Sequence, residues 1–148
     1  MKTGEVCNRT VIVVGRDTSL GEAAKLMREN HVGSLVVVDD TDGRAPVGIV
    51  TDRDIVVEVL SSGLDHRTVT VGEIMGGKLV TAREDDDWLD TLKAMRGRGV
   101  RRVPVVNAAG ELVGIVTVDD LLEVVAEQLD DIVRAIGNEQ NRESSQRP

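Results

Sequence analysis

The sequence contains no phenylalanine or tyrosine, and Trp88 is its single aromatic residue. Proteins that bind single-stranded nucleic acid stack the bases on aromatic side chains, and this chain lacks such a platform. Basic residues are also scarce, because 18 Lys and Arg stand against 26 Asp and Glu, for a net charge of −8. Nonspecific affinity for a phosphate backbone comes from clustered positive charge. We therefore expect no nucleic-acid partner.

Cysteine and long apolar runs are scarce too. Cys7 is the only cysteine, so no internal disulfide can form, and with His31 and His66 it does not form a cluster at zinc-ligand spacing. No apolar run approaches the roughly 20 residues that a membrane-spanning helix needs. The first ten residues lack the apolar segment of a secretion signal. We expect no metal, no membrane partner and a cytoplasmic location.

Catalytic motifs are missing as well. No combination of residues resembles a Ser/His/Asp or Cys/His nucleophile set, and the two histidines make poor general-base candidates. The "GEIMGGK" stretch at 72–78 begins like a phosphate-binding loop, but Leu79 stands where Ser or Thr would hold Mg²⁺. The "DRD" stretch at 52–54 offers two carboxylates that point apart at a predicted helix start, with no third ligand. The chain is therefore not expected to be an enzyme.

The chain does contain an internal duplication. "VGIVTDRDIV" at 47–56 is followed by "VGIVTVDDLL" at 113–122, and "GEVC" at 4–7 is followed by "GEIM" at 72–75. Such self-similarity is the signature of a repeat architecture. With 148 residues, 41% of them hydrophobic, the chain can fill an aliphatic core shared by two small units. We expect a first repeat at 1–66, a second at 67–127, and a helical extension with a polar tail at 128–148.

Each copy predicts the order strand, helix, strand, strand, helix, which makes the fold α/β (α+β). The first strands are expected at 11–14 and 79–82, since both are short apolar runs. The following helices begin at Ser19, which forms a capping box with Glu22, and at Asp87. Two strands separated by a polar turn then lead to a helix directly after Thr51 or Thr117.

The last helix continues beyond the repeat with an apolar stripe at spacings of 3, 4, 3 and 4 residues, formed by Leu122, Val125, Leu129, Ile132 and Ile136. Such a stripe has to be covered. It either folds back on its own core or packs on a second subunit, and the sequence leaves both possibilities open. Because the duplication also gives the molecule twofold character, we predict a homodimer.

The Thr-x-x-Asp sequences at the strand-to-helix junctions have two interpretations. Thr51 and Asp54 form a capping box, which satisfies backbone amides at the start of a helix. The same geometry suits a ligand: free amides and the Thr hydroxyl can bind phosphate, and the carboxylate can accept two sugar hydroxyls. Thr117 and Asp120 repeat the arrangement.

The chain resembles a tandem pair of cystathionine-β-synthase (CBS) domains over roughly residues 1–127. The resemblance rests on "GEVC", "GEIM", "VRRVPVV" at 100–106, "GIVTDRDI" and "GIVTVDDL". It implies two pseudo-twofold-related β-α-β-β-α repeats that pack through their sheets and leave two clefts for adenosine nucleotides such as AMP, ATP, NAD or S-adenosylmethionine. The aspartates of the junctions would contact ribose and the threonines would contact phosphate.

The resemblance also implies the remaining ligand contacts. Base contacts would come from main chain and small side chains near Val11, Val32, Gly33, Ser34, Leu79 and Val100. Phosphates would meet Arg101 and Arg102, and further Arg53 or Lys78. The expected function is a non-catalytic regulatory sensor that signals to an unidentified target protein, with the nucleotide as a regulatory ligand and no obligatory cofactor. The alternative is a structural homodimerisation module whose clefts are unoccupied.

Overall fold

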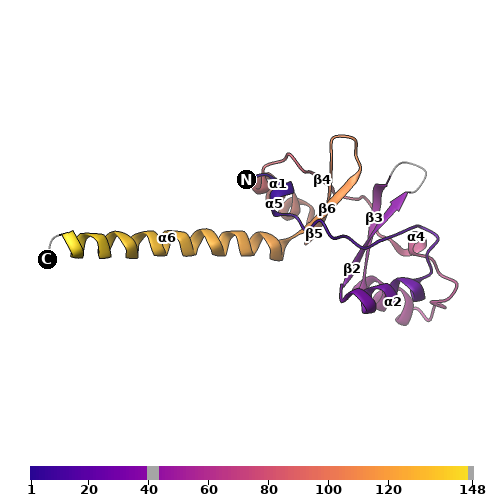
Figure 1. Cartoon of the computed structure of the whole chain (residues 1–148). Coiled ribbons are helices and arrows are strands. Elements are labelled where there is room, and N and C mark those ends of the chain that lie inside the picture. Colours follow the sequence, from indigo (N-terminus) through magenta and orange to yellow (C-terminus); the bar gives the residue numbers. More distant parts are fainter. Residues whose placement is uncertain (40–43, 147–148) are drawn as a thin grey trace.

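The computed structural model describes residues 1–39 and 44–146 of the chain (Figure 1). The first half contains α1 (Thr3–Val6), β1 (Val13–Val14), α2 (Leu20–Asn30), β2 (Ser34–Asp39), β3 (Ala45–Thr51), α3 (Asp52–Ile55) and the π-helical turn η2 (Val56–Leu60). The second half contains α4 (Val71–Ile74), β4 (Ala82–Arg83), α5 (Trp88–Arg98), β5 (Arg102–Val106), β6 (Leu112–Thr117) and α6 (Val118–Gln146). The mixed α/β fold with two repeats confirms the predicted fold class.

Two three-stranded sheets have the same topology. In the order β1-β2-β3 the first pair is parallel and the second antiparallel, and β4-β5-β6 repeats this pattern. The registers correspond as well, since Val36 faces Ile49 in the first sheet and Pro104 faces Ile115 in the second. The duplication seen in the sequence is therefore a duplication of strand pairing.

The first strand of each sheet is shorter than predicted. β1 contains only the second half of the expected strand at 11–14, and β4 begins at Ala82, the last residue of the expected strand at 79–82. Val11 packs instead at the contact between the two sheets, and Leu79 lines a pocket between the repeats. The apolar runs thus located partly buried segments, of which only Val13, Val14 and Ala82 are paired in the sheets.

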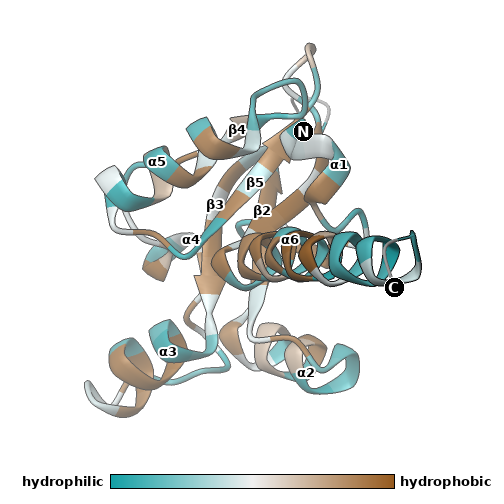
Figure 2. Cartoon of the chain, turned by 90° about the vertical axis from the view of Figure 1, so that its left-hand side faces the viewer, coloured by the Kyte–Doolittle hydropathy of each residue, from teal (hydrophilic) through white to brown (hydrophobic). Residues whose placement is uncertain are grey.

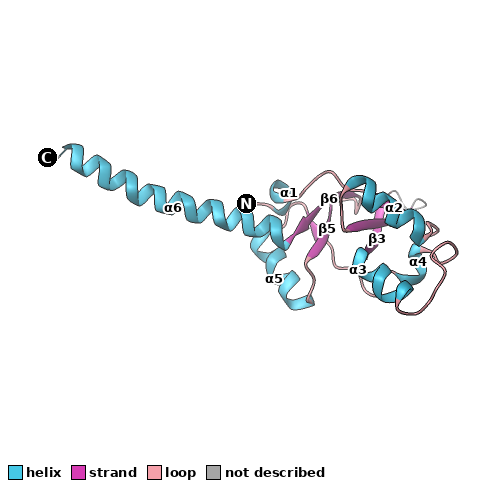
Figure 3. Ribbon diagram, turned by 90° about the horizontal axis from the view of Figure 1, so that it is seen from below, coloured by secondary structure: helices cyan, strands magenta, loops and turns pink. Residues whose placement is uncertain are grey.

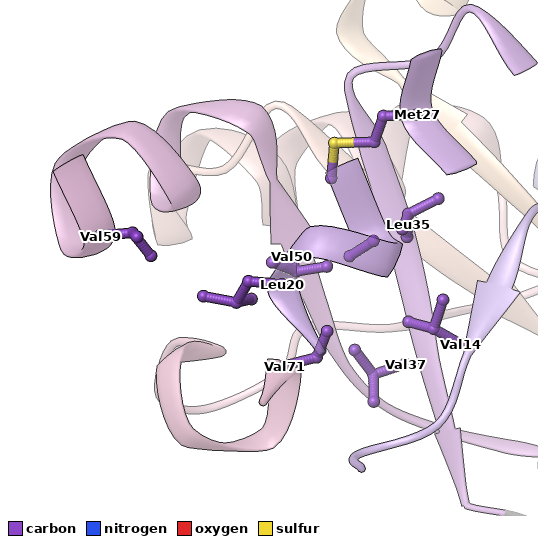
Figure 4. Close-up of a cluster of buried hydrophobic side chains, with 9 residues drawn as sticks. Val14, Leu20, Met27, Leu35, Val37, Val50, Val59 and Val71 are labelled. Atoms are coloured by element: carbon purple, nitrogen blue, oxygen red, sulfur yellow. The ribbon is translucent and has the colours of Figure 1, made fainter. Parts of the chain in front are cut away.

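The first core forms between α2 and its sheet (Figure 4). Leu20, Ala23 and Met27 are buried along one face of α2 and pack with Leu35 and Val50, whereas Ala24, which the helical spacing also places on this face, is exposed. Ser19 accepts a hydrogen bond from the Glu22 amide at 3.2 Å. The N-cap at Ser19 is thereby confirmed, without a reciprocal bond from the Glu22 side chain.

The second core mirrors the first one. Trp88 and Met95 of α5 pack with Val103, Val116 and Leu121, and all five are at most 7% exposed. Asp87 caps α5 by accepting a hydrogen bond from the Leu89 amide at 2.9 Å. The predicted start of this helix is correct.

The two sheets pack against each other, as expected for a pair of repeats. Val36 and Val38 of β2 form a buried cluster with Leu112 of β6, and Ile115 packs on it. This third cluster joins the repeats through their strands. The two repeats consequently share one body, and α6 extends from it (Figure 3).

The short helices α1 and α4, which were not predicted, are exchanged between the repeats. The Thr3 amide donates to the Asp86 carbonyl at 2.7 Å, so α1 packs on the second repeat. Conversely, the Val71 amide donates to the Thr18 carbonyl at 2.8 Å, and Val71 is buried in the first core. The boundary at residue 66 therefore separates the two repeats in the sequence but not in the packing. The first segment of each repeat covers the core of the other repeat.

Helix α6 has 29 residues and leaves the body as a single straight element (Figures 1 and 3). Leu121 is 2% exposed and anchors its first turn in the second core, whereas the stripe from Leu122 to Ile136 is exposed. Of the two possibilities that the sequence left open, folding back on the own core is therefore wrong. Among the described residues, no helix combines the length and the apolarity that crossing a bilayer requires.

Candidate functional site

Two pockets lie between the repeats, and we name each after its aspartate. The Asp54 pocket has a volume of about 400 Å³, and the Asp120 pocket has a volume of about 250 Å³. Thr51 and Asp54 of the first repeat line the former together with Lys78, Leu79 and Val100 of the second. Each pocket is thus built from both halves of the chain.

The Asp120 pocket has the reciprocal composition. Thr117 and Asp120 of the second repeat line it together with Val11, Val32 and Gly33 of the first. The two Thr-x-x-Asp junctions therefore lie in different pockets, and each faces the approach to the first strand of the other repeat. This arrangement follows the twofold relation between the repeats.

Most of the residues proposed from the sequence lie in these pockets. The Asp54 pocket contains Thr51, Asp54, Lys78, Leu79, Val100, Arg101 and Arg102. The Asp120 pocket contains Val11, Val32, Gly33, Ser34, Thr117 and Asp120, and also Arg102. Arg53 is exposed on the first turn of α3 and lines neither pocket.

The capping boxes predicted at both junctions are present with matching geometry. The Asp54 amide donates to Thr51 Oγ1 at 3.1 Å, and the Thr51 amide donates to Asp54 Oδ2 at 2.9 Å. Thr117 and Asp120 form the same two bonds at the same distances. In the described part of the chain, Oδ1 of neither aspartate has a hydrogen-bond partner. The cap therefore occupies one carboxylate oxygen and leaves the other for a ligand.

The amides at the start of α3 are not free, which corrects an expectation from the sequence. At the start of α3, the Asp52 amide donates to the Gly33 carbonyl at 3.0 Å and the Arg53 amide to Asp52 Oδ1 at 2.8 Å. The Val118 amide of α6 likewise donates to the Arg101 carbonyl at 2.8 Å. These carbonyls come close because β2 and β5 pair with the strands that end at the junctions. An anionic group in the Asp54 pocket would thus depend on side chains.

The two pockets differ in charge. Three cationic side chains, Lys78, Arg101 and Arg102, line the Asp54 pocket against one carboxylate, whereas the Asp120 pocket has Arg102 against Asp120. Arg101 lies 3.7 Å from Asp119, in an ion pair that is largely exposed and consequently weak. The Asp54 pocket is therefore the more favourable of the two for an anion.

Among the residues that the structure describes, Arg102 is the one that lines both pockets, and the equivalent position in the first repeat is held by Ser34. It is half-buried and forms no ion pair or side-chain hydrogen bond within the part of the chain that the structure describes. A guanidinium in this state keeps its donors available for carboxylate or phosphate oxygens.

Sequence reasoning missed several lining residues. Asn8 and Thr10 line the Asp120 pocket, and Gly76 lines the Asp54 pocket. Asn8 and Gly76 stand 68 positions apart, directly after the matched "GEVC" and "GEIM" stretches. Alignment of the two repeats beyond these stretches was the signal that could have identified them.

The glycines of the two "GIVT" runs allow a close crossing of the chain. A Cβ atom on Gly114 would lie 2.7 Å from Cys7 Sγ and 2.9 Å from the Asn8 carbonyl oxygen. A Cβ atom on Gly48 would lie 2.6 Å from Met75 Sδ. Burial at this crossing raises the pKa of the Cys7 thiol, while the charge of Arg9 opposes the shift. The absence of a side chain at these glycines therefore lets the segments that follow α1 and α4 cross closely over β6 and β3.

A wider hollow of about 570 Å³ lies beside α2, outside the contact between the repeats. Its ionisable lining residues are Arg16, Asp17, Glu22 and Asp39, so acidic groups predominate. Among the described residues, no group of three or more His, Cys, Asp or Glu side chains is placed to hold a metal ion. The two pockets between the repeats remain the candidate site.

Comparison with known families identifies the architecture. The sequence profile of the CBS domain matches residues 4–61 and again residues 71–127. The chain belongs to the CBS domain family. Its two CBS domains correspond to the two copies found in the sequence and to the two sheets of the structure.

Two related sequences cover most of this CBS pair. An uncharacterised protein of Methanopyrus kandleri is 39% identical over 124 residues, which are 84% of this chain and 62% of that protein. Hypoxic response protein 1 of Mycobacterium tuberculosis is 38% identical over 117 residues, 79% of this chain and 80% of the relative. The chain therefore spans less than two thirds of the first relative and most of the second.

Solved CBS structures are similar over the same region. Hypoxic Response Protein I with two coordinated zinc ions is 36% identical, with a TM-score of 0.73 over 83% of this chain and 98% of that one. A CBS domain protein of Pyrobaculum aerophilum in complex with AMP is 27% identical, with a TM-score of 0.74 over 85% and 99%. The CBS pair of protein MJ0100, solved with 5-methylthioadenosine and S-adenosyl-L-methionine, is also 27% identical, with a TM-score of 0.74 over 86% and 98%.

Proposed function

We propose that this CBS pair is a non-catalytic regulatory module that binds an adenosine nucleotide between its two repeats. The observation that carries the proposal is the composition of the pockets, in which the Thr-x-x-Asp junction of one repeat faces the other repeat. Each junction retains an unpartnered carboxylate oxygen that can accept ribose hydroxyls. Similar structures that hold AMP, 5-methylthioadenosine or S-adenosyl-L-methionine support an adenosine ligand.

The Asp54 pocket is the proposed site for a nucleotide with phosphate groups. Its volume of about 400 Å³ falls in the range of roughly 300–1,000 Å³ that small-molecule sites occupy. Leu79 and Val100 supply an apolar wall for the base, and Lys78, Arg101 and Arg102 supply positive charge for the phosphates. The Asp120 pocket is smaller and less cationic, so a ligand there would bind more weakly or carry less negative charge.

Regulation follows from the position of the pockets. A ligand that contacts both repeats stabilises the arrangement of the repeats to which it binds most tightly. It can change the conformational equilibrium only by this difference in affinity. The repeats share a buried cluster of aliphatic residues, so a change at a pocket can reach the rest of the body. We propose that a homodimer of this module passes the signal to a target protein, in the cytoplasm.

Ligand binding is tested first by thermal unfolding with AMP, ADP, ATP, NAD and S-adenosylmethionine. A ligand at 100 times its dissociation constant stabilises the folded state by about 2.7 kcal/mol, which gives a measurable rise in Tm. Isothermal titration calorimetry with the best ligand then gives the affinity and the number of sites. If none of these compounds raises the Tm, the chain is instead a structural module with unoccupied clefts.

The variant Asp54→Asn separates ligand binding from helix capping. In Asp54→Asn the side-chain oxygen can still accept the bond from the Thr51 amide, but the second carboxylate oxygen becomes an NH₂ group that cannot accept ribose hydroxyls. We expect an unchanged Tm without ligand and a loss of the nucleotide response. Asp52→Asn is the matched control, because Asp52 lies on the same helical turn and lines neither pocket. Equal responses in both variants would refute the assignment of ribose to Asp54.

A further inference from the structure

Helix α6 exposes a row of large aliphatic side chains to solvent. Five of its large aliphatic side chains repeat at heptad spacing and are between 43% and 64% exposed, namely Leu122, Val125, Leu129, Ile132 and Ile136. We call these five residues the α6 seam. In Figure 2 the brown colour of hydrophobic residues follows α6 outward from the body, and the end of the helix is teal.

The seam is free of charge along its whole length. The acidic residues nearby, Glu123, Glu127, Asp130 and Asp131, all fall on other positions of the heptad. Arg134 Nε donates to Asp130 Oδ2 at 2.7 Å, so this ion pair also lies off the seam. A heptad-spaced aliphatic seam with charges on the outer positions is typical of a helix that packs on another helix.

The charge of α6 excludes an anionic membrane surface as the partner. Membrane-surface helices are rich in Lys and Arg on their polar face. In α6, eight acidic residues stand against Arg134 and Arg142, so the helix is repelled by anionic lipids. A helix with its own apolar seam fits this charge pattern instead.

The structure assigns this seam to the α6 helix of a second copy of the chain, in antiparallel orientation. The orientation follows from the distribution of charge. Residues 118–131 contain six acidic residues and no basic one, whereas residues 132–146 contain two of each sign and are neutral. Antiparallel packing places each acidic half beside a neutral half, while parallel packing places the two acidic halves together.

The end of the heptad supports the same orientation. After Ile136, the next two seam positions are Glu139 and Glu143. In a parallel pair each of these carboxylates would face its own copy across the seam, which is unfavourable for like charges. Antiparallel packing moves them to the two ends of the seam. In the register we propose, Leu129 faces the partner subunit's Ile132, and Val125 faces the partner subunit's Ile136.

The α6 seam itself lies clear of the body. Leu121 fixes the first turn of α6 in the second core, and beyond that turn the helix extends away from both sheets (Figure 1). Because the pairing does not involve either pocket, it stands or falls independently of nucleotide binding.

Light scattering on charge variants tests whether the seam is an interface. The chain has a mass of 16.0 kDa, and we expect Leu129→Lys with Ile132→Lys to halve the mass of the wild-type particle. Glu127→Lys with Asp131→Lys is the matched control, because it places the same side chains on the outer face of the same turns, and it should keep the wild-type mass. A wild-type monomer, or a seam variant with unchanged mass, would overturn the proposal.

Cysteine cross-linking tests the orientation in a Cys7→Ala background. Single Val125→Cys and single Ile136→Cys chains are oxidised separately and as a mixture. Antiparallel packing predicts disulfide-linked dimers in the mixture only, since each introduced cysteine faces the other position. Efficient cross-linking of either variant with itself would show parallel packing, and an absence of cross-links in all three samples would reject the proposed register.

Discussion

Arg102 pairs with Thr117 across the β5–β6 ladder, and this pairing places the arginine at the boundary between the Asp54 and Asp120 pockets. Thr117 itself belongs to the Asp120 pocket, while the neighbours Val100 and Arg101 belong to the other. The guanidinium of Arg102 is thus shared by the two sites. The first repeat has no equivalent guanidinium, because Ser34 stands at the corresponding position.

Replacement of Arg102 by alanine should weaken the binding of phosphate-bearing nucleotides about 10-fold or more, since a hydrogen bond to a charged group contributes about 1.5–3 kcal/mol. The affinity for 5-methylthioadenosine, which has no phosphate, should change much less. Isothermal titration calorimetry measures both. Arg53→Ala removes the same charge outside the pockets and should bind like the wild type. An equal loss in the two variants would point to a general effect of charge.

The two crossing glycines predict different costs for the same substitution. Gly114→Ala would push a methyl group against the Asn8 backbone, and we expect a destabilisation of about 1–3 kcal/mol, as for other overpacked positions. At Gly48 the nearest atoms belong to the flexible side chain of Met75, so Gly48→Ala should cost less. Urea unfolding of both variants gives the comparison. A larger loss at Gly48 would contradict the packing described at the crossings.

The repeat pattern predicted most of the fold. Strand pairs, helix starts at Ser19 and Asp87, and the two caps at Thr51 and Thr117 depend on local sequence, so periodicity and capping residues were sufficient to find them. The two clefts between the repeats were predicted from the resemblance to CBS domains. Of the proposed ligand contacts, Arg53 fell outside the pockets, because one residue along a helix turns a side chain by about 100°.

Other features depend on contacts between distant segments and leave no local signal. The exchange of α1 and α4 is of this kind, since nothing in "GEVC" or "GEIM" indicates which repeat the segment will contact. The occupied amides of α3 are another example. Whether the Asp52 amide is free depends on the Gly33 carbonyl, which directly precedes β2 and is brought to α3 by the pairing of Ser34 with Thr51.

The exchanged segment α1 is attached through a buried hydrogen bond between Thr3 Oγ1 and Thr91 Oγ1, 2.7 Å apart. Thr3→Val or Thr91→Val alone leaves the other hydroxyl buried without a partner, and each should cost about 1–3 kcal/mol. The double variant should cost clearly less than the sum of the two. Chemical denaturation of the four chains completes the cycle. Additive losses would show that the two hydroxyls do not interact.

Cys7 predicts a pH dependence of stability. Burial raises the pKa of its thiol above the ordinary value of 9.0, so the folded state retains a proton that the unfolded state loses. The associated stability is complete below the unfolded pKa and is lost as the pH rises through the folded pKa. The unfolding free energy of the wild type should therefore fall relative to Cys7→Ala between pH 8 and pH 10. A difference that stays constant over this range would contradict the shift.

The exchange of α1 and α4 bears on how such a protein could arise. If a chain with a single repeat kept this geometry, its leading segment would have no repeat of its own to cover and would have to complete a neighbouring molecule. The ancestor would then be a domain-swapped dimer, and gene fusion would convert an association between molecules into one within a chain. Separating the present chain at residue 66 would reverse that history, because each fragment would carry the covering segment that the other requires.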